Sequence, residues 1–320
     1  MTKPLVSLTV ICYNAENFIE EAIEGALSQT YSPLEIIFSD DNSPDRTFEI
    51  IQEKLKNYQG PHKIVLNQNP KNLGIGSHIS KVWFNIAKGD WIIVSAGDDI
   101  SLPDRVEKLM EFANEDVGLI HHNCFFINEK SEEISDRNKT DYSKCIEVFE
   151  KNDIEETIRT GMFVKGATMC INKKVLDTFG TFNADVVQED KILAYRAQYL
   201  GKIIHLDDCL MKYRMHSKSS SYQHDATQFK WYVKIKQDQA NKFIAVHKQI
   251  LTDNKILKLS NTLLKELEFR KRGFEMDLFL YSDHQFKLNY LLDKRFFRKL
   301  IARLFINQRL MLKRKRQNQR

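Results

Sequence analysis

The 320-residue sequence predicts an α/β fold: a mostly parallel β-sheet flanked by helices, followed by a helical C-terminal region. Over the first hundred residues, short apolar runs rich in β-branched residues alternate with helical patterns, which is typical of parallel strands joined by crossover helices. Beyond about residue 226 the chain is charged and helical, with no recognisable strand. Three of the early apolar runs end in polar residues, and in such sheets ligands bind at the carboxyl ends of the strands.

The first two strand–helix pairs can be placed from apolar spacing. Residues 6–11 form the first apolar run, and residues 18–27 follow with apolar side chains at three- and four-residue spacing. We expect Asn14 to cap this helix. Residues 34–38 form the second strand, and the next helix is expected to begin at Ser43-Pro44, because proline suits the first position of a helix.

The remaining elements are expected to continue the alternation and then depart from it. Residues 63–66 and 91–95 are the third and fourth strands, separated by the loop 72–76 and a helix that ends at Ala87. Further strands are expected at residues 118–126, 167–171, 202–205 and 210–213, the last two bracketing Asp207-Asp208. A helix follows Gln188-Glu189-Asp190.

Composition excludes several classes of protein. Hydrophobic residues make up 42% of the chain and charged residues 28%, but no stretch is long and apolar enough for a transmembrane helix. The five cysteines form no CxxC pair, which argues against a zinc site or a disulfide framework. The opening MTKPLVSLTV lacks a signal-peptide pattern, so we expect a cytoplasmic protein.

Two regions are expected, a domain over residues 1–222 and a helical region over residues 223–320, divided within the polar run 217–225. The last thirty residues are strongly basic, with apolar residues at helical spacing, which is typical of an element that lies on an anionic membrane surface. The alternative is a terminal helix that packs its apolar stripe on the domain. Nucleic-acid binding is disfavoured, because the net charge of +5 is concentrated at one end.

Adjacent carboxylates end two of the strands. Asp98-Asp99 follows the fourth strand, and such oxygen ligands suit Mg²⁺ or Mn²⁺ held together with substrate phosphates. Asp40-Asp41 follows the second strand, where a carboxylate can accept hydrogen bonds from a base or ribose. For both pairs, ordinary turn chemistry is the alternative.

Later in the chain, Glu189 and Asp190 open a helix, where a carboxylate is either a cap stabilised by the helix dipole or a general base. Arg214 and His216 follow the last strand, and they either face phosphates or are structural. The loop 72–76 matches neither GxxxxGK[ST] nor GxGxxG, so a P-loop kinase and a nicotinamide dehydrogenase are not supported.

Five segments, in this order, resemble those of a family-2 glycosyltransferase with the Rossmann-like GT-A fold. They are VSLTVICYNAENFIEEAIEGALSQTY, LEIIFSDDNSPDRT, NLGIG with AKGDWIIVSAGDDISLPDR, QED, and YRMHSKSSS. The resemblance covers roughly residues 4–220, and its specificity lies in the order and spacing of the motifs rather than in any one of them.

The resemblance implies roles residue by residue. Asp190 would be the general base that takes the proton of the acceptor hydroxyl, with Glu189 supporting it. Asp99 and His216 would hold a divalent cation, Mn²⁺ or Mg²⁺. Contacts to the nucleotide sugar would come from Cys12, Tyr13, Asp40, Asp41, Asp98 and Arg214.

The resemblance also implies an activity: inverting transfer of a sugar from a nucleotide-diphosphate sugar, expected to be a UDP-sugar, to a glycan acceptor. Gly97 stands where many relatives carry the first aspartate of the metal motif. The QxxRW motif of processive members is absent, so we expect one sugar per encounter. The expected acceptor is lipid-linked, as in lipopolysaccharide O-antigen or capsule synthesis, with the enzyme peripheral on the cytosolic face of the inner membrane.

Two other functions agree with parts of the sequence. A sugar-phosphate nucleotidyltransferase shares the nucleotide-binding sheet, but it needs a basic, glycine-rich loop after the first strand, where this chain has Tyr13-Asn14-Ala15-Glu16. A catalytically inactive membrane scaffold that binds nucleotide sugars would be expected to have lost Asp99 or Asp190, and both are present.

Overall fold

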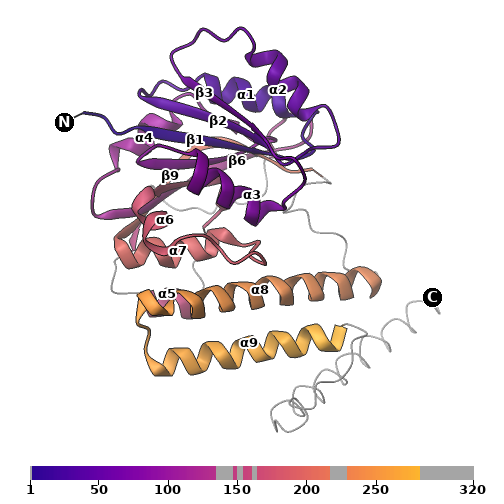
Figure 1. The fold of residues 1–320 in the computed structure, drawn as a ribbon, viewed down its shortest axis with the longest axis vertical. Coiled ribbons are helices and arrows are strands. Elements are labelled where there is room, and N and C mark those ends of the chain that lie inside the picture. The colour runs from indigo at the N-terminus through magenta and orange to yellow at the C-terminus, as the bar shows by residue number, and fades with distance from the viewer. Residues whose placement is uncertain (1, 135–146, 150–153, 161–163, 217–228, 282–320) are drawn as a thin grey trace. The chain divides into compact units, whose positions relative to one another are not determined.

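The computed structural model describes residues 2–134, 147–149, 154–160, 164–216 and 229–281 (Figure 1). The strands are β1 (Val6–Cys12), β2 (Leu34–Asp40), β3 (Lys63–Gln68), β4 (Trp91–Ala96), β5 (Ile100–Ser101), β6 (Val117–Ile127), β7 (Glu147–Phe149), β8 (Met169–Asn172) and β9 (Lys202–Arg214). The α-helices are α1 (Ile19–Leu27), α2 (Thr47–Leu55), α3 (Ile75–Lys81), α4 (Arg105–Glu111), α5 (Ile154–Thr160), α6 (Lys173–Phe179), α7 (Glu189–Leu200), α8 (Phe229–Leu257) and α9 (Asn261–Tyr281).

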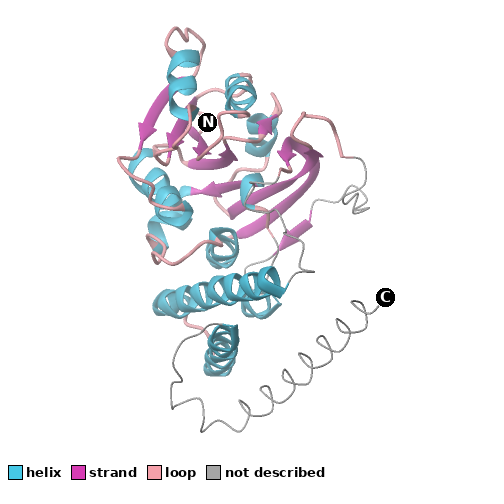
Figure 2. Cartoon of the chain, turned by 90° about the vertical axis from the view of Figure 1, so that its right-hand side faces the viewer, coloured by secondary structure: helices cyan, strands magenta, loops and turns pink. Residues whose placement is uncertain are grey.

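The described strands form one nine-stranded sheet in the order β3-β2-β1-β4-β8-β6-β9-β5, with β7 also paired to β9. The pairs β1–β2, β1–β4, β2–β3 and β6–β9 are parallel, whereas β8 runs antiparallel to both β4 and β6. Helices lie on both sides of the strands (Figure 2). The predicted α/β fold with a mostly parallel sheet is therefore confirmed.

The parallel register brings three strand ends to one edge. Cys12 at the end of β1 pairs with Asp40 at the end of β2, and Ile11 pairs with Ala96 at the end of β4. β1 and β2 are buried along their full length, as expected for strands covered on both faces. The polar residues that follow these strands therefore start from neighbouring points on the sheet.

Two predicted helix starts were wrong. Asn14 has a positive φ of 57°, its backbone N–H donates to Ser43 Oγ (2.8 Å), and α1 begins only at Ile19. The second helix begins at Thr47 rather than at Pro44. Asp45 explains the delay, because its carboxylate accepts the backbone N–H of Thr47 (3.1 Å) and fixes a turn before the helix.

The two strands expected on either side of Asp207-Asp208 are one continuous strand, β9. Its register with β6 shifts between His122 and Asn123, so a bulge accommodates the polar pair without ending the strand. The Asn123 side chain donates to the carbonyl of Asp207 (3.2 Å) at this point. The short strands β5 and β7 and helix α6 were not predicted.

Two compact units divide the chain. One consists of Met1–His224 and Ala245–Leu264, and the other of Asp225–Ile244 and Lys265–Arg320. The end of α8 and the beginning of α9 thus belong with the sheet, and the boundary at residue 222 stays a prediction. No helix within the described ranges combines the length and apolar character needed to cross a bilayer. The predicted basic amphipathic segment lies outside the described residues.

Candidate active site

The two carboxylates at the end of β2 are buried and hold the adjacent loops in place by hydrogen bonds. Asp40 accepts the backbone N–H of Ser43 (2.9 Å) and the Ser43 hydroxyl. Asp41 accepts the Asn69 side chain (2.7 Å) and the backbone N–H groups of Leu73 and Gly74 (both 2.9 Å). Because a carboxylate offers about four acceptor positions, Asp41 has little capacity left. Both residues shape the wall of the site, and a ligand contact would use their remaining lone pairs.

Tyr13 and Cys12 lie next to each other in sequence but differ in accessibility. The Tyr13 side chain is 52% exposed beyond the end of β1, where a nucleotide base could stack on it. Cys12 is fully buried, and burial raises the pKa of its thiol well above the usual range. The predicted contact of Cys12 with the nucleotide sugar stays a prediction, and with the thiol buried it would involve the Cys12 backbone. The Cys12 carbonyl accepts the backbone N–H of Asp41 (2.9 Å) and fixes the neighbouring strand end.

Gly97 is packed tightly against β1 and the residues that follow it. A Cβ on Gly97 would lie 3.1 Å from Cys12 Sγ and 3.3 Å from Ala15 Cβ, so the buried thiol would have to move. The acidic function at the end of β4 therefore falls to Asp98 and Asp99.

Asp99 is the most unusual carboxylate at this edge. It is 2% exposed; its Oδ1 accepts the backbone N–H of Arg214 (2.9 Å), and its buried Oδ2 has no hydrogen-bond partner among the described residues. Burial, and secondly the charge of Asp98, raises the pKa of Asp99 well above its usual range. A buried carboxylate with an unused oxygen is costly unless a ligand compensates it.

Asp98 is more exposed and is paired with an imidazole. His216 Nε2 lies 2.9 Å from Asp98 Oδ2, and the His216 ring packs 4.8 Å from the ring of Phe18. The structure thus brings Asp98, Asp99 and His216 together, although His216 is distant from the other two in sequence.

The Arg214 guanidinium, predicted to contact the nucleotide sugar, is hydrogen-bonded by the protein itself. The Arg214 side chain is buried, and its guanidinium donates to the Asp98 carbonyl (2.8 Å) and to Glu21 Oε2 (2.9 Å). The same guanidinium donates to the Asn128 carbonyl (3.1 Å) and the Ser131 hydroxyl (3.0 Å). Because these donors are engaged by the protein, we assign Arg214 the role of positioning Asp98 and Asp99 rather than of binding phosphate directly.

The donor set fits a divalent cation that is completed by substrate. Within the part of the chain that the structure describes, no three His, Cys, Asp or Glu side chains gather as a ready-made metal site. Mg²⁺ and Mn²⁺ do not require one, because they are commonly held by one or two carboxylates together with phosphate oxygens. The unpartnered Asp99 Oδ2 and the neighbouring Asp98 meet that requirement.

Replacing Asp99 with asparagine tests this fit. We expect the melting temperature to stay within about 3 °C of wild type, because the amide oxygen can still accept the Arg214 N–H and no charge has to be buried. With UDP present, Mn²⁺ should raise the melting temperature of the wild type but not of the variant. Thermal unfolding with and without Mn²⁺ measures both, with half-exposed Asp104→Asn as the control. An equal Mn²⁺ shift in all three proteins would contradict the assignment.

Glu189 and Asp190 form the second acidic pair, in the first turn of α7. Burial, and secondly the charge of Asp190, raises the pKa of Glu189 to about 8. Asp190 Oδ1 accepts the backbone N–H of Lys191 (2.8 Å). A Cβ on Gly166 would lie 3.4 Å from Glu189 Oε1 and 3.9 Å from Asp190 Cβ, so the chain before β8 passes directly over this pair. Glu189 is therefore held protonated at neutral pH beside an acidic neighbour.

The raised pKa of Glu189 predicts a pH-dependent stability. The folded state binds a proton that the unfolded state releases near pH 4.5, so this residue stabilises the fold less as the pH rises from about 4.5 to 8. Glu189→Gln should remove this loss and raise the free energy of unfolding at pH 8 by about 2 kcal/mol over wild type. The value is reduced for solvent screening, because Glu189 is partly exposed. Urea unfolding at pH 5 and pH 8 measures it, with exposed Glu111→Gln as control. A gain independent of pH would exclude ionisation as its cause.

Two cations near these carboxylates were missed in the sequence. Arg105 is fully buried and donates to the carbonyls of Val94 (2.8 Å) and Ala167 (2.7 Å), so it joins the end of β4 to the segment before β8. The Lys165 ammonium lies 4.1 Å from the centre of the Phe126 ring. Arg105 ends the quoted segment AKGDWIIVSAGDDISLPDR but was given no role, and Lys165 belongs to no quoted motif. The pairing of β8 between β4 and β6 brings both residues to this edge.

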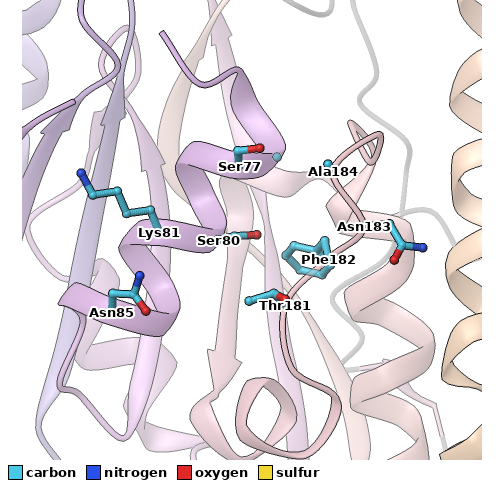
Figure 3. A pocket seen from close by; sticks show the side chains of 9 residues that line it. Ser77, Ser80, Lys81, Asn85, Thr181, Phe182, Asn183 and Ala184 are labelled. Carbon is cyan, nitrogen blue, oxygen red and sulfur yellow. The ribbon is translucent and has the colours of Figure 1, made fainter. Parts of the chain in front are cut away.

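A separate hollow of about 270 Å³ lies beside α3 (Figure 3). Ser77, Ser80, Lys81 and Asn85 line it from the helix side, and residues 181–184 line it from the loop that leads toward α7. None of the predicted site residues lines this hollow, so it is distinct from the carboxyl edge of the sheet.

The parallel sheet with carboxylate pairs at its carboxyl edge defines the class: a GT-A glycosyltransferase fold. Of solved structures, Staphylococcus aureus TarS 1-349 in complex with UDP-GlcNAc has a TM-score of 0.55 at 16% identity, over 86% of this chain and 81% of that one. The mannosyltransferase PcManGT from Pyrobaculum calidifontis, in complex with GDP-Man and Mn²⁺, has a TM-score of 0.56 at 15% identity, over 98% and 81%.

The sequence pattern of glycosyl transferase family 2 matches residues 7–179, and the chain belongs to that family. An uncharacterized glycosyltransferase of Methanocaldococcus jannaschii is 37% identical over 133 residues, which is 40% of this chain. The matched region spans 44% of that relative, less than half its length. The family and the fold predicted from the sequence motifs are thus confirmed.

Proposed function

We propose that the chain is a non-processive, inverting glycosyltransferase that moves one sugar from a nucleotide-diphosphate sugar to a glycan acceptor. The observation that carries the proposal is the pairing of two acidic sites with different chemistry. Asp99 is a buried carboxylate with an unpartnered oxygen at the end of β4, and Glu189-Asp190 opens α7 beneath the segment before β8. The Asp99 site suits a cation that neutralises a charged leaving group, and the Glu189-Asp190 site suits a base that deprotonates a hydroxyl nucleophile.

The base role falls to Asp190. An alcohol is a poor nucleophile, and a positioned carboxylate that removes its proton contributes to the rate. Glu189, with a pKa of about 8, keeps its proton at neutral pH and adds no second charge beside Asp190. The two adjacent carboxyl groups therefore separate into a neutral partner and a proton acceptor. Inversion follows if Asp190 directs the acceptor oxygen to the face of the anomeric carbon opposite the diphosphate.

The donor site is assigned to the carboxyl ends of β1, β2 and β4. Tyr13 would stack on the base, with the remaining lone pairs of Asp40 and Asp41 nearby, and Asp98 would contact the ribose. Asp99 with His216 would hold Mn²⁺ or Mg²⁺, which when bound supplies charge neutralisation for the departing diphosphate. The complexes of TarS with UDP-GlcNAc and of PcManGT with GDP-Man and Mn²⁺ support a nucleotide-sugar donor and a divalent cation. We propose UDP as the nucleotide.

The acceptor is proposed to be lipid-linked, in the synthesis of an O-antigen or capsular polysaccharide. The support is the basic amphipathic pattern after residue 290, which suits the anionic cytosolic face of a membrane. Flotation with anionic liposomes compares the full chain with one ending at residue 290. We expect only the full chain to float, and equal flotation would remove the membrane proposal.

A donor screen tests the function itself. The full chain is incubated with Mn²⁺, UDP- or GDP-sugars and glycan acceptors, both soluble and lipid-linked, and release of nucleoside diphosphate is measured. Acceptor-dependent release of UDP is the expected result. Release of pyrophosphate from a nucleoside triphosphate and a sugar phosphate would instead identify a nucleotidyltransferase. Binding of nucleotide sugar without any turnover would identify an inactive scaffold.

A further inference from the structure

The Lys165 ammonium is within ion-pair distance of no described carboxylate. Its ammonium lies over two aromatic rings, 4.1 Å from the centre of Phe126 and 4.6 Å from that of Tyr213. Its one described hydrogen bond is to Cys124 Sγ (3.4 Å), and it makes no ion pair with any described residue. The two rings pack edge to face with centroids 5.9 Å apart, which fixes the ammonium by cation–π attraction.

This ammonium lies near Asp99, and the segment that carries it passes close to the second acidic pair. Its charge acts on Asp99, where it opposes the effect of burial on the pKa of that carboxyl. A Cβ added at the next residue, Gly166, would lie 3.4 Å from Glu189 Oε1, so this segment passes close to the second acidic pair. The segment is held in place, because Arg105 donates to the Ala167 carbonyl (2.7 Å) and Thr168 Oγ1 donates to the Lys165 carbonyl (2.8 Å).

We propose that Lys165, with Phe126 and Tyr213 beneath it, is a binding residue for an acidic group, a carboxylate or a phosphate, on one of the sugar substrates. The inference rests on the proposed glycosyl transfer, because it places the sugar between Asp99 and Asp190. A partly buried ammonium without an ion-pair partner among the described residues gains most from an anion that arrives with the substrate. A purely structural lysine would more commonly extend into water or pair with a carboxylate.

The acidic group could be carried by the donor sugar or by the acceptor sugar, and binding experiments separate the two. Lys165→Met and Lys165→Arg are compared with wild type and with Lys174→Met, a matched change of an exposed lysine on α6. The donor arm measures the Kd of UDP alone, a UDP-hexose and a UDP-hexuronate in the presence of Mn²⁺. The acceptor arm measures the Kd of an alkyl hexoside, an alkyl hexuronide and a hexose phosphate without nucleotide.

In one arm, we expect the wild type to bind the acidic probe about tenfold more tightly than the neutral one. Lys165→Met should abolish this preference, while Lys165→Arg retains part of it and Lys174→Met retains all of it. The affinity for UDP alone should not change in any variant. Because the acceptor arm contains no nucleotide, it remains informative even if the proposed donor is wrong.

Three outcomes would overturn the proposal. Equal weakening of UDP alone by Lys165→Met would show that the ammonium contacts the diphosphate. An acidic preference that survives Lys165→Met would place the anion elsewhere. Equal affinity of the wild type for acidic and neutral probes in both arms, or no binding of any acidic probe, would make Lys165 a structural residue.

Discussion

Asp253→Ala is expected to lower the free energy of unfolding by about 3–5 kcal/mol, because it leaves a buried arginine without its counter-charge. The Arg196 and Asp253 side chains are 0% and 2% exposed, with Nε 2.7 Å and Nη2 3.0 Å from the carboxylate oxygens. The same carboxylate accepts the Tyr195 hydroxyl (2.7 Å) and the Gln249 side chain (2.9 Å). Urea unfolding monitored by circular dichroism measures the loss.

The chain supplies a matched surface control. Lys248 and Asp185 form an ion pair at 3.1 Å, with both side chains about half exposed. Lys248→Ala should cost no more than about 1 kcal/mol, as is usual for exposed pairs. The double replacement Arg196→Met with Asp253→Leu should be more stable than Asp253→Ala, since it removes both buried charges. An equal loss in the free energy of unfolding for Asp253→Ala and Lys248→Ala would show that the buried pair is not a special contributor to stability.

This buried pair also bears on function. Arg196 lies on α7, whose first turn carries Glu189 and Asp190, and Asp253 lies on the part of α8 that belongs to the same compact unit. Gln249 accepts the backbone N–H of Asn183 (2.7 Å), in the loop before α7. The end of α8 therefore holds the helix that presents the proposed base.

Asp190→Asn is expected to reduce kcat by about 10²–10⁴-fold, the usual contribution of a general base. The donor Kd should stay close to that of wild type, because the proposed nucleotide contacts are at Tyr13, Asp40, Asp41 and Asp98. Steady-state rates of UDP release with a verified acceptor measure kcat, and a donor titration measures the Kd.

Asp185→Asn is the control for this replacement, since it removes an exposed carboxylate from the same loop–helix segment. Its kcat should match that of wild type. Full transfer by Asp190→Asn would exclude Asp190 as the base. A parallel rise in donor Kd would instead place Asp190 in donor binding.

The motif residues were predictable from sequence because each follows a recognisable strand or opens a helix. The end of β4 with Asp98-Asp99, the end of β2 with Asp40-Asp41, and the start of α7 with Glu189-Asp190 all lie where the apolar pattern placed them. Local backbone geometry was less predictable. Asn14 and Pro44 resemble helix starts, but side chains of distant residues, such as Ser43 on Asn14, decide where α1 and α2 begin.

The sequence did not predict which side chains remain available to a ligand. Arg214 resembles a phosphate ligand, yet Glu21, Asn128 and Ser131 take its donors, and these come from segments far from it in sequence. Cys12 lies beside exposed Tyr13 but points into the core. The sequence shows which chemical groups the chain contains, whereas burial and hydrogen bonding decide which of these groups a ligand can contact.

By itself, the sequence determined the alternation of strands and helices, the family motifs and therefore the carboxyl edge at which the acidic pairs gather. These depend on local periodicity and on the fixed direction of parallel strands. Only the tertiary structure decided that Asp99 has an unpartnered buried oxygen, that Gly97 packs tightly against Cys12, and that the Lys165 ammonium lies over the Phe126 ring near Asp99. Those properties arise from contacts between residues far apart in the chain, and no local pattern records them.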